Sequence, residues 1–357
     1  MSTATPAVDP RARIAALALG AAAGALFAWL RTPLPWLIGP LIACAGASIA
    51  GARLQGTPVL RGAGQWAIGA ALGLYFTPAV LARVAQLWPA LVVGIGWALA
   101  VGLACAWALR RHAQADPATA FFAGAIGGAS EMALQGERNG GSVETIAAAH
   151  SLRILLVVVI LPFAFRWLDL HGADTWRPAL HTAEWPRLAG LVAATCAAAL
   201  LMRVTRSPNA WVIGPLLAAG VLTAFGLGPT ALPAWAINGG QVFIGVALGT
   251  RFRPGFFTRA PRLMAVVAGS TLVAILASAG FAAVLARAVD LPVPTMVLAT
   301  SPGGIAEMSL TAKVLGLGVP IVTVFHVTRM VALVLVAGAV YRALAVRLGW
   351  PVGRQRR

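Results

Sequence analysis

Long apolar stretches alternate with short polar turns along nearly the whole chain. Each stretch has about 15 to 25 residues, close to the roughly 20 residues that an α-helix needs to cross a bilayer. The pattern therefore predicts an all-α polytopic integral membrane protein. The expected helical stretches lie at 14–30, 34–52, 62–76, 87–109, 144–166, 187–202, 209–225, 235–250, 263–287 and 320–342.

Two further stretches, 117–137 and 293–313, are interrupted by the glycine pairs Gly127-Gly128 and Gly303-Gly304. Backbone released from a helix is tolerated at membrane depth only where it is buried in protein or lines a cavity. Each stretch is expected to be either a re-entrant segment or a broken full span, and the pattern alone admits both arrangements.

An internal repeat relates the two halves of the chain. GQWAIGAALG at 64–73 matches GQVFIGVALG at 240–249 at seven of ten positions. GGASEM at 127–132 matches GGIAEM at 303–308 in the same register. Such self-similarity across a long segment indicates duplication of a structural unit.

A second shared block, WLIGPL and WVIGPL, begins at Trp36 in one half and Trp211 in the other. Arg11 and Arg13 before an apolar run also resemble a signal peptide. We interpret that run as an uncleaved first span because it has a counterpart in the second half. The expected organisation is a cytoplasmic leader at 1–12, membrane repeats at 13–168 and 187–343, a polar linker at 169–186 and a basic cytoplasmic tail at 344–357.

Charge supports a membrane setting. Only 10% of the residues are charged and the net charge is +17, whereas soluble domains average about 25% charged residues. The arginines lie singly or in small groups between apolar stretches, as the positive-inside rule expects, and this distribution argues against a nucleic-acid partner. Membrane lipids are the expected surroundings.

Orientation follows from the same arginines. If each interrupted stretch enters and returns, each half crosses five times and the repeats are inverted, with about 10 net crossings. Most arginines then lie on the cytoplasmic side, together with both termini, of a bacterial inner membrane.

Glu131 and Glu307 each follow a glycine pair by three residues. An ionisable group at membrane depth is costly and is by default a candidate functional residue. Since protonation or cation binding would neutralise it, each glutamate is a candidate site for a coupling ion, H⁺ or Na⁺. The structural alternative is an ion pair with Arg153 or Arg329.

A His-x-x-Arg pair recurs early in a long apolar stretch of each half, as His150 with Arg153 and as His326 with Arg329. Residues three apart share a helix face. An arginine there could present its fork of donors to a carboxylate or phosphate. The substrate-binding candidates are Gly127, Gly128, Arg153, Gly303, Gly304 and Arg329, with the histidines in support. Alternatively, each arginine neutralises the glutamate of its own half.

Gln65 and Gln241 are further supporting candidates, because an amide in an apolar helix needs a hydrogen-bond partner. They could equally bridge two helices. Glycines follow them at spacings of four, a pattern typical of close helix packing. These glycines are Gly69, Gly73, Gly245 and Gly249.

The paired GG-x-x-EM and W-x-IGPL blocks resemble the bacterial AbrB membrane-protein family over nearly the whole chain. That family carries the labels ammonia monooxygenase and regulator of gene expression, and it is similar to cation/proton antiporters and bile-acid symporters. The resemblance implies inverted repeats with broken helices. The motif positions Gly127, Gly128, Glu131, Gly303, Gly304 and Glu307 carry over.

A secondary transporter is the favoured function, moving a small solute coupled to H⁺ or Na⁺, and an anion would suit the arginines. A non-transporting membrane regulator is the alternative. The three cysteines and five histidines show no metal-ligand spacing. We therefore expect no metal, no cofactor and no enzymatic activity, and a monooxygenase is the least favoured class. The apolar outer helices would permit a homodimer.

Overall fold

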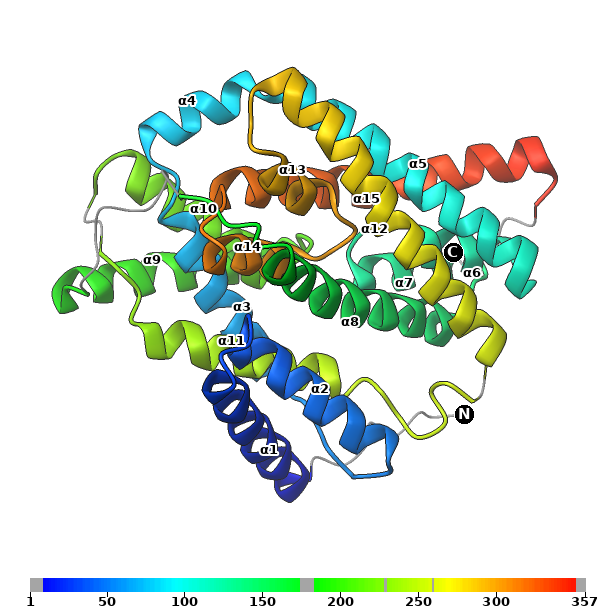
Figure 1. Ribbon diagram of the computed structural model, residues 1–357, viewed down its shortest axis with the longest axis horizontal. Helices are drawn as coiled ribbons and strands as arrows, with labels where there is room; N and C mark the ends of the chain where they lie inside the picture. The colour runs from blue at the N-terminus through cyan, green and yellow to red at the C-terminus, as the bar shows by residue number, and fades with distance from the viewer. Residues whose placement is uncertain (1–8, 174–182, 228–229, 259, 351–357) are drawn as a thin grey trace.

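The computed structural model describes residues 9–173, 183–227, 230–258 and 260–350, and all regular structure within them is α-helical (Figure 1). Parts of the expected leader, linker and tail lie outside the described residues. These parts are 1–8, 174–182 and 351–357.

The first half contains α1 (Pro10–Trp29), α2 (Pro35–Ile49), α3 (Pro58–Gly73), α4 (Pro78–Gln86), α5 (Trp88–Ala113), α6 (Pro117–Gly124), α7 (Ala129–Arg138) and α8 (Val143–Trp167). The second half contains α9 (Trp185–Val204), α10 (Ala210–Ala224), α11 (Ala234–Gly249), α12 (Pro261–Val289), α13 (Val293–Thr300), α14 (Ile305–Val314) and α15 (Val319–Leu348). Five helices of the first half have partners of identical length. The pairs are α1 and α9 with 20 residues, α2 and α10 with 15, α3 and α11 with 16, α6 and α13 with 8, and α7 and α14 with 10.

The helix α4 interrupts this correspondence, and the apolar pattern did not predict it. Thr77 caps its start through its hydroxyl, Pro78 follows at the first helical position, and α4 is bent by 90° from α3. At the other end of the chain, α15 continues to Leu348, past the expected boundary at residue 343. It stops where Gly349 adopts a φ of +65°, the left-handed conformation that ends many helices.

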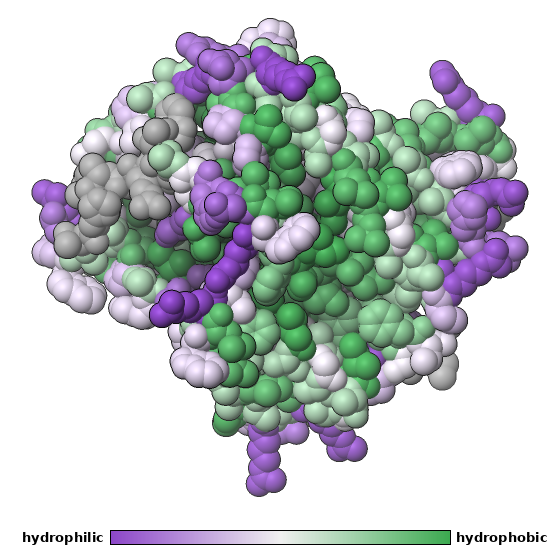
Figure 2. Space-filling view, in the orientation of Figure 1, coloured by the Kyte–Doolittle hydropathy of each residue, from purple (hydrophilic) through white to green (hydrophobic). Residues whose placement is uncertain are grey.

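The described helices fit a multi-pass membrane protein. Six of them are long and apolar enough to cross a bilayer, namely α1, α5, α8, α9, α12 and α15. The helices α2, α10 and α11 are apolar but shorter. Figure 2 shows apolar residues across the middle of one face, with hydrophilic residues gathered toward its edges. Exposed leucines such as Leu276 (73%) and Leu335 (75%) suit contact with lipid rather than water.

The helices pack as two bundles. In the first, α1 to α3 interlock with α9 to α11, so that α2 packs against α11 and α3 against α10. In the second, α5 to α8 interlock with α12 to α15, so that α5 packs against α12 and α15, and α12 against α8. Fewer contacts join the bundles, mainly where α14 meets α3 and α2 meets α8.

The duplicated sequence motifs pack against each other across the two halves of the first bundle. A Cβ at Gly69 would collide with the Val212 carbonyl of α10, and one at the equivalent Gly245 would lie 2.5 Å from the Leu37 carbonyl of α2. Each GQ-x-x-IG motif therefore contacts the W-x-IGPL motif of the other half. The glycines allow backbone to approach backbone, as their spacing predicted.

Substituting Gly245 with alanine is expected to destabilise the protein by about 1–3 kcal/mol, because the new methyl would collide with the Leu37 carbonyl and with Pro40. A methyl group added at Gly269 in α12 would meet nothing within 4 Å, so Gly269→Ala is the matched control. The control is expected to be neutral or up to about 1 kcal/mol stabilising. Thermal unfolding midpoints in detergent would measure both, and equal midpoints would contradict the packing account.

Candidate functional site

Each half contains a helical hairpin, which we define as α6–α7 (the first hairpin) and α13–α14 (the second hairpin). Each hairpin closes at its base. The backbone N–H of Ser142 donates to the Thr119 hydroxyl at 2.7 Å, and the N–H of Gly318 donates to the Thr295 hydroxyl at 3.2 Å. Because these bonds join the first turn of one half-helix to the residues after the other, each hairpin begins and ends at the same place.

The tips of the hairpins are the glycine pairs. Gly128 and Gly304 are the N-cap residues of α7 and α14, and neither cap supplies a side-chain hydrogen bond. The preceding half-helices end in extended backbone at Ala125 (ψ 135°) and Ser301 (ψ 153°). The predicted interruptions therefore occur at these pairs, and Pro302 before the second one prevents α13 from continuing.

The GG-x-x-EM motif is explained by contacts within each tip. A Cβ at Gly127 would lie 2.9 Å from the Met132 methyl, and the Met132 side chain is fully buried. A Cβ at Gly128 would collide with the Glu131 carboxylate. Gly303 with Met308, and Gly304 with Glu307, repeat both contacts. The first glycine thus makes room for the methionine and the second for the carboxylate.

The two carboxylates lie at the N-termini of the second half-helices. Glu131 and Glu307 are in the first turns of α7 and α14, folded back onto their N-cap glycines. The free N–H groups and positive dipole end there favour a negative charge. Glu307 is 9% exposed, whereas Glu131 is half-buried. Neither carboxylate is within 4 Å of a basic group among the described residues.

The first His-x-x-Arg pair forms hydrogen bonds with carbonyls at the C-terminal end of α6. Arg153 donates to the carbonyls of Ala123 (3.3 Å), Gly124 (3.1 Å) and Ala125 (2.9 Å). The His150 Nε2 lies 2.9 Å from the Phe122 carbonyl. The last four carbonyls of a helix have no partner within it, so these side chains satisfy groups that would otherwise be buried without one.

The second pair repeats the arrangement at the end of α13. Arg329 donates to the carbonyls of Ser301 (2.6 Å) and Gly303, and the His326 Nε2 lies 2.8 Å from the Leu298 carbonyl. Each arginine also donates to the Nδ1 of its histidine. Each imidazole is therefore neutral, with its proton on Nε2. The positive guanidinium also suits the negative dipole end of the half-helix.

These contacts bear on the roles expected for the arginines. Arg153 and Arg329 lie in the core of the second bundle, against the same hairpins that carry the predicted site. Their guanidinium groups donate to backbone carbonyls rather than to the glutamates of their own halves. Their role in binding substrate stays a prediction.

Two other arginines approach the glutamates. Arg61 in α3 lies within electrostatic range of both Glu131 and Glu307, and Arg251, two residues after α11, lies within range of Glu307 and of Arg61. Both are half-buried, and neither guanidinium group has a hydrogen-bond partner among the described residues. The sequence placed both in cytoplasmic connections. Only the packing of α14 against α3 brings the two bundles together here.

The glutamines lie on the facing bundle. Gln65, one turn after Arg61 in α3, donates its amide to the Asn209 side chain at 3.2 Å, which links α3 to the start of α10. Gln241 is buried in α11 and lies 3.4 Å from the Asn238 side chain of its own helix. Gln65 therefore bridges two helices, whereas the amide of Gln241 donates within α11.

Among the described residues, no group of three or more histidine, cysteine, aspartate or glutamate residues lies close enough together to hold a metal ion. His150 of α8 and His326 of α15 already use both ring nitrogens in the hydrogen bonds described above.

Comparisons with known proteins identify one family and two full-length relatives. A family model described as "Transition state regulatory protein AbrB" matches residues 36–345. "Uncharacterized protein YhjN" of Bacillus subtilis (strain 168) is 26% identical over 352 residues, covering 92% of each chain. "Putative regulator AbrB" of Escherichia coli (strain K12) is 24% identical over 325 residues, covering 89% of this chain and 92% of its own. No solved structure matches.

Proposed function

The chain belongs to the AbrB family, and we propose that it is a secondary transporter that moves a small anionic solute, coupled to H⁺ or Na⁺, across the bacterial inner membrane. The observation that carries this proposal is the pair of hairpins. Each has a glycine-broken tip, a glutamate on the free N-terminus of its second half-helix, and equivalent contacts in the other half. Paired broken helices in duplicated halves are typical of transporter binding sites.

The topology we propose is five crossings in each half with the repeats inverted. Because each hairpin begins and ends at the same place, it adds no crossing. The equivalent helices α5 and α12 pack against each other and run in opposite directions. The equivalent helices α8 and α15 also run in opposite directions (Figure 1). Parallel repeats would give equivalent helices the same direction.

Tryptophan positions support this topology. Five tryptophans that are the first, second or last residue of a helix are between 66% and 84% exposed, and tryptophan is enriched at membrane interfaces. A sixth, Trp107, is 65% exposed and lies inside α5, toward the other side. With inverted repeats all five fall on the side opposite the termini, whereas parallel repeats would divide them. They are Trp29, Trp88, Trp167, Trp185 and Trp235.

A near two-fold relation between the halves is supported by one crossing point. A Cβ at Gly64 of α3 would lie 2.5 Å from the Gly240 carbonyl of α11, and a Cβ at Gly240 would lie 3.1 Å from the Gly64 carbonyl. Gly64 and Gly240 are equivalent positions of the repeat. Reciprocal contact of equivalent residues is the property of a two-fold interface.

The charges suggest how ion and solute would be coupled. The two hairpin glutamates share one region between the bundles with Arg61 and Arg251. Protonation or Na⁺ binding at Glu131 and Glu307 would remove the negative charge and leave the arginines to attract an anion. The two bundles, joined by few contacts, would then shift against each other to expose the site alternately. No chemical conversion is required of any residue, and we propose no enzymatic activity.

A membrane regulator is the second candidate. It rests on two names, the description of the family model and the name of the Escherichia coli relative. A regulator would keep its effect when the hairpin glutamates are neutralised, whereas a transporter would lose its ion coupling.

Neutralising a hairpin glutamate is expected to abolish the response to the coupling ion without unfolding the protein. The measurement is thermal unfolding of purified protein in detergent, scanned against Na⁺, pH and a panel of organic anions, for wild type, Glu131→Gln and Glu307→Gln. A ligand at 100 times its Kd stabilises the folded state by about 2.7 kcal/mol. Glu137→Gln, at an exposed glutamate of the same helix α7, is the matched control.

The transporter proposal expects a wild-type shift that the control keeps and both hairpin variants lose. An ion or anion response that survives in both hairpin variants would contradict the assigned ion site. The anion identified in this screen would then be tested for accumulation in liposomes driven by an ion gradient.

A further inference from the structure

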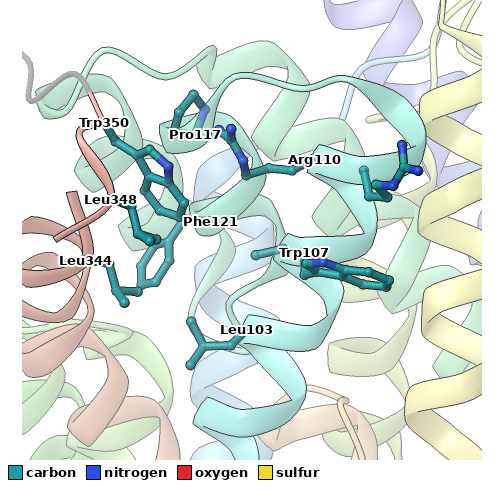
Figure 3. Close-up of a pocket in the computed structure, with 10 residues that line it drawn as sticks. Leu103, Trp107, Arg110, Pro117, Phe121, Leu344, Leu348 and Trp350 are labelled. Carbon is teal, nitrogen blue, oxygen red and sulfur yellow. The ribbon is translucent and has the colours of Figure 1, made fainter.

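A groove lies between the C-terminal ends of α5 and α15, beside α6 (Figure 3). Its volume is about 440 Å³, within the range of small-ligand sites. Its walls are mostly apolar, and Leu103, Leu344 and Leu348 supply the aliphatic part. Trp107 stands at one side and is 65% exposed. Such a surface, at the end of a helix long and apolar enough to cross a membrane, suits contact with lipid.

The polar part of the groove is a pair of arginines. Arg110 and Arg111 are in the last turn of α5. The guanidinium carbon of Arg110 lies 4.8 Å from the centre of the Trp350 ring. A guanidinium stacked on an aromatic face keeps its donors free in the plane of the group. Figure 3 shows Arg110 extending from α5 toward Pro117 and Trp350, with Leu344 and Leu348 on one side of the groove and Trp107 on the other.

Arg110 carries a donor without a partner. Its Nη1 is buried and has no hydrogen-bond partner among the described residues. Asp116 is nearby in sequence, but its carboxylate accepts the Thr119 backbone N–H at 2.9 Å and caps α6. No acid lies within 4 Å of either arginine among the described residues. That nitrogen is closed to solvent, so a ligand in the groove would meet the other donors of Arg110, which is half-buried, and those of Arg111, which is exposed.

We infer that this groove binds an anionic phospholipid from the bilayer. The headgroup phosphate accepts from Arg110 and Arg111, and an acyl chain lies along Leu103, Leu344 and Leu348. An amphipathic anion is required because the groove pairs two cations at one end with an aliphatic surface at the other. Free phosphate would bind only to the two cations and would leave the aliphatic surface uncovered. Basic residues at a membrane surface contribute about 1 kcal/mol each to the attraction of anionic lipid. The inference does not depend on transport.

The site also touches the first hairpin. Pro117 and Phe121 of α6 form part of the groove wall. The Phe121 ring packs against Phe122, whose carbonyl lies against His150. A bound lipid would therefore contact the N-terminal half of α6 and stabilise the folded protein.

The test compares phosphatidylglycerol with phosphatidylcholine of identical acyl chains, each added to purified protein in a neutral detergent. Phosphatidylglycerol is expected to raise the thermal midpoint of wild type by several degrees more than phosphatidylcholine does. The excess should disappear in the double variant Arg110→Gln/Arg111→Gln. It should also disappear in Leu344→Trp, which fills the groove and leaves the charges in place. Inorganic phosphate should give no shift.

The matched control is Arg203→Gln/Arg206→Gln, which removes two arginines from the end of α9, away from the groove. It should keep the full excess shift. Equal shifts with both lipids, a shift with phosphate alone, or equal loss of the excess in the control would each overturn the inference.

A second measurement tests the same site without relying on the groove variants, which could fold poorly. Phosphatidylglycerol brominated on its acyl chains should quench wild-type tryptophan fluorescence more than brominated phosphatidylcholine. This difference in quenching between the two lipids should be smaller in Trp107→Phe, which leaves 11 of the 12 tryptophans in place. An unchanged difference in that variant would contradict a lipid chain in this groove.

Discussion

Arg329→Leu is expected to destabilise the folded protein by about 2–4 kcal/mol, because it leaves the carbonyls of Ser301 and Gly303 buried without donors and removes the partner of His326. Leucine is apolar enough for the bundle interior, so the loss arises from the unsatisfied groups rather than from a polar misfit. Arg329→Lys should recover part of the stability, since one ammonium can reach fewer carbonyls than the planar fork.

The measurement is the yield of monodisperse protein in detergent and its thermal midpoint. Arg342→Leu, at an exposed position of the same helix α15, is the matched control and should change the midpoint little. A wild-type midpoint for Arg329→Leu would mean that the guanidinium does not hold the end of α13. It would also leave the arginine free for the substrate role that the sequence suggested.

Arg61→Gln and Arg251→Gln are each expected to weaken anion binding at least about tenfold, which corresponds to about 1.4 kcal/mol. Both guanidinium groups lie half-buried near Glu307 and have no hydrogen-bond partner among the described residues. A charge removed from such a place changes the attraction for an anion more than one removed from the surface. The fold should survive, since glutamine keeps most of the side-chain volume.

The readout is the concentration of anion that gives half of the maximal thermal shift. Arg253→Gln removes an exposed arginine two residues from Arg251 and should leave that concentration unchanged. If all three variants behave alike, the effect is one of overall charge, and the proposed contact with the anion is wrong.

The sequence predicted the hairpin tips well because their cause is local. Two adjacent glycines, a proline before the second pair, and an acid three residues later determine where a helix stops and which group lies at the next N-terminus. The glycine faces of α3 and α11 were predicted for the same reason. Their spacing of four is a property of one helix. In both cases the same residue pattern occurs in both halves of the chain, which made it easier to recognise.

The partners of those residues could not be predicted in the same way. His150 and Arg153 were correctly expected on one helix face, but the partner expected for Arg153 was an anionic substrate or, alternatively, the glutamate of its own half. The structure gives backbone carbonyls instead, because a half-helix that ends inside the protein leaves carbonyls as well as N–H groups unpaired. No side chain marks a carbonyl in the sequence.

Arg61 and Arg251 were missed for a different reason. Each lies at the end of an apolar stretch, where an arginine ordinarily contacts water or lipid headgroups. Their approach to the glutamates depends on how the two bundles meet, which is a long-range feature. The helix α4 was missed because its nine residues include Arg83 and Gln86 and do not form an apolar stretch.

The central claim is that the hairpin tips form a site reached alternately from the two sides of the membrane. It can be tested without knowing the solute.

Ser130, an exposed residue next to Glu131, would be changed to cysteine in a chain whose Cys44, Cys105 and Cys196 are replaced by alanine. Membrane-impermeant thiol reagents would then be applied to right-side-out and inside-out vesicles. Ala52→Cys and His171→Cys, at exposed positions expected on opposite sides, report the sidedness. A transporter predicts that Ser130→Cys is modified from both sides while each reporter is modified from one. Modification of Ser130→Cys from one side only, whatever ion or anion is present, would contradict alternating access and favour the regulator.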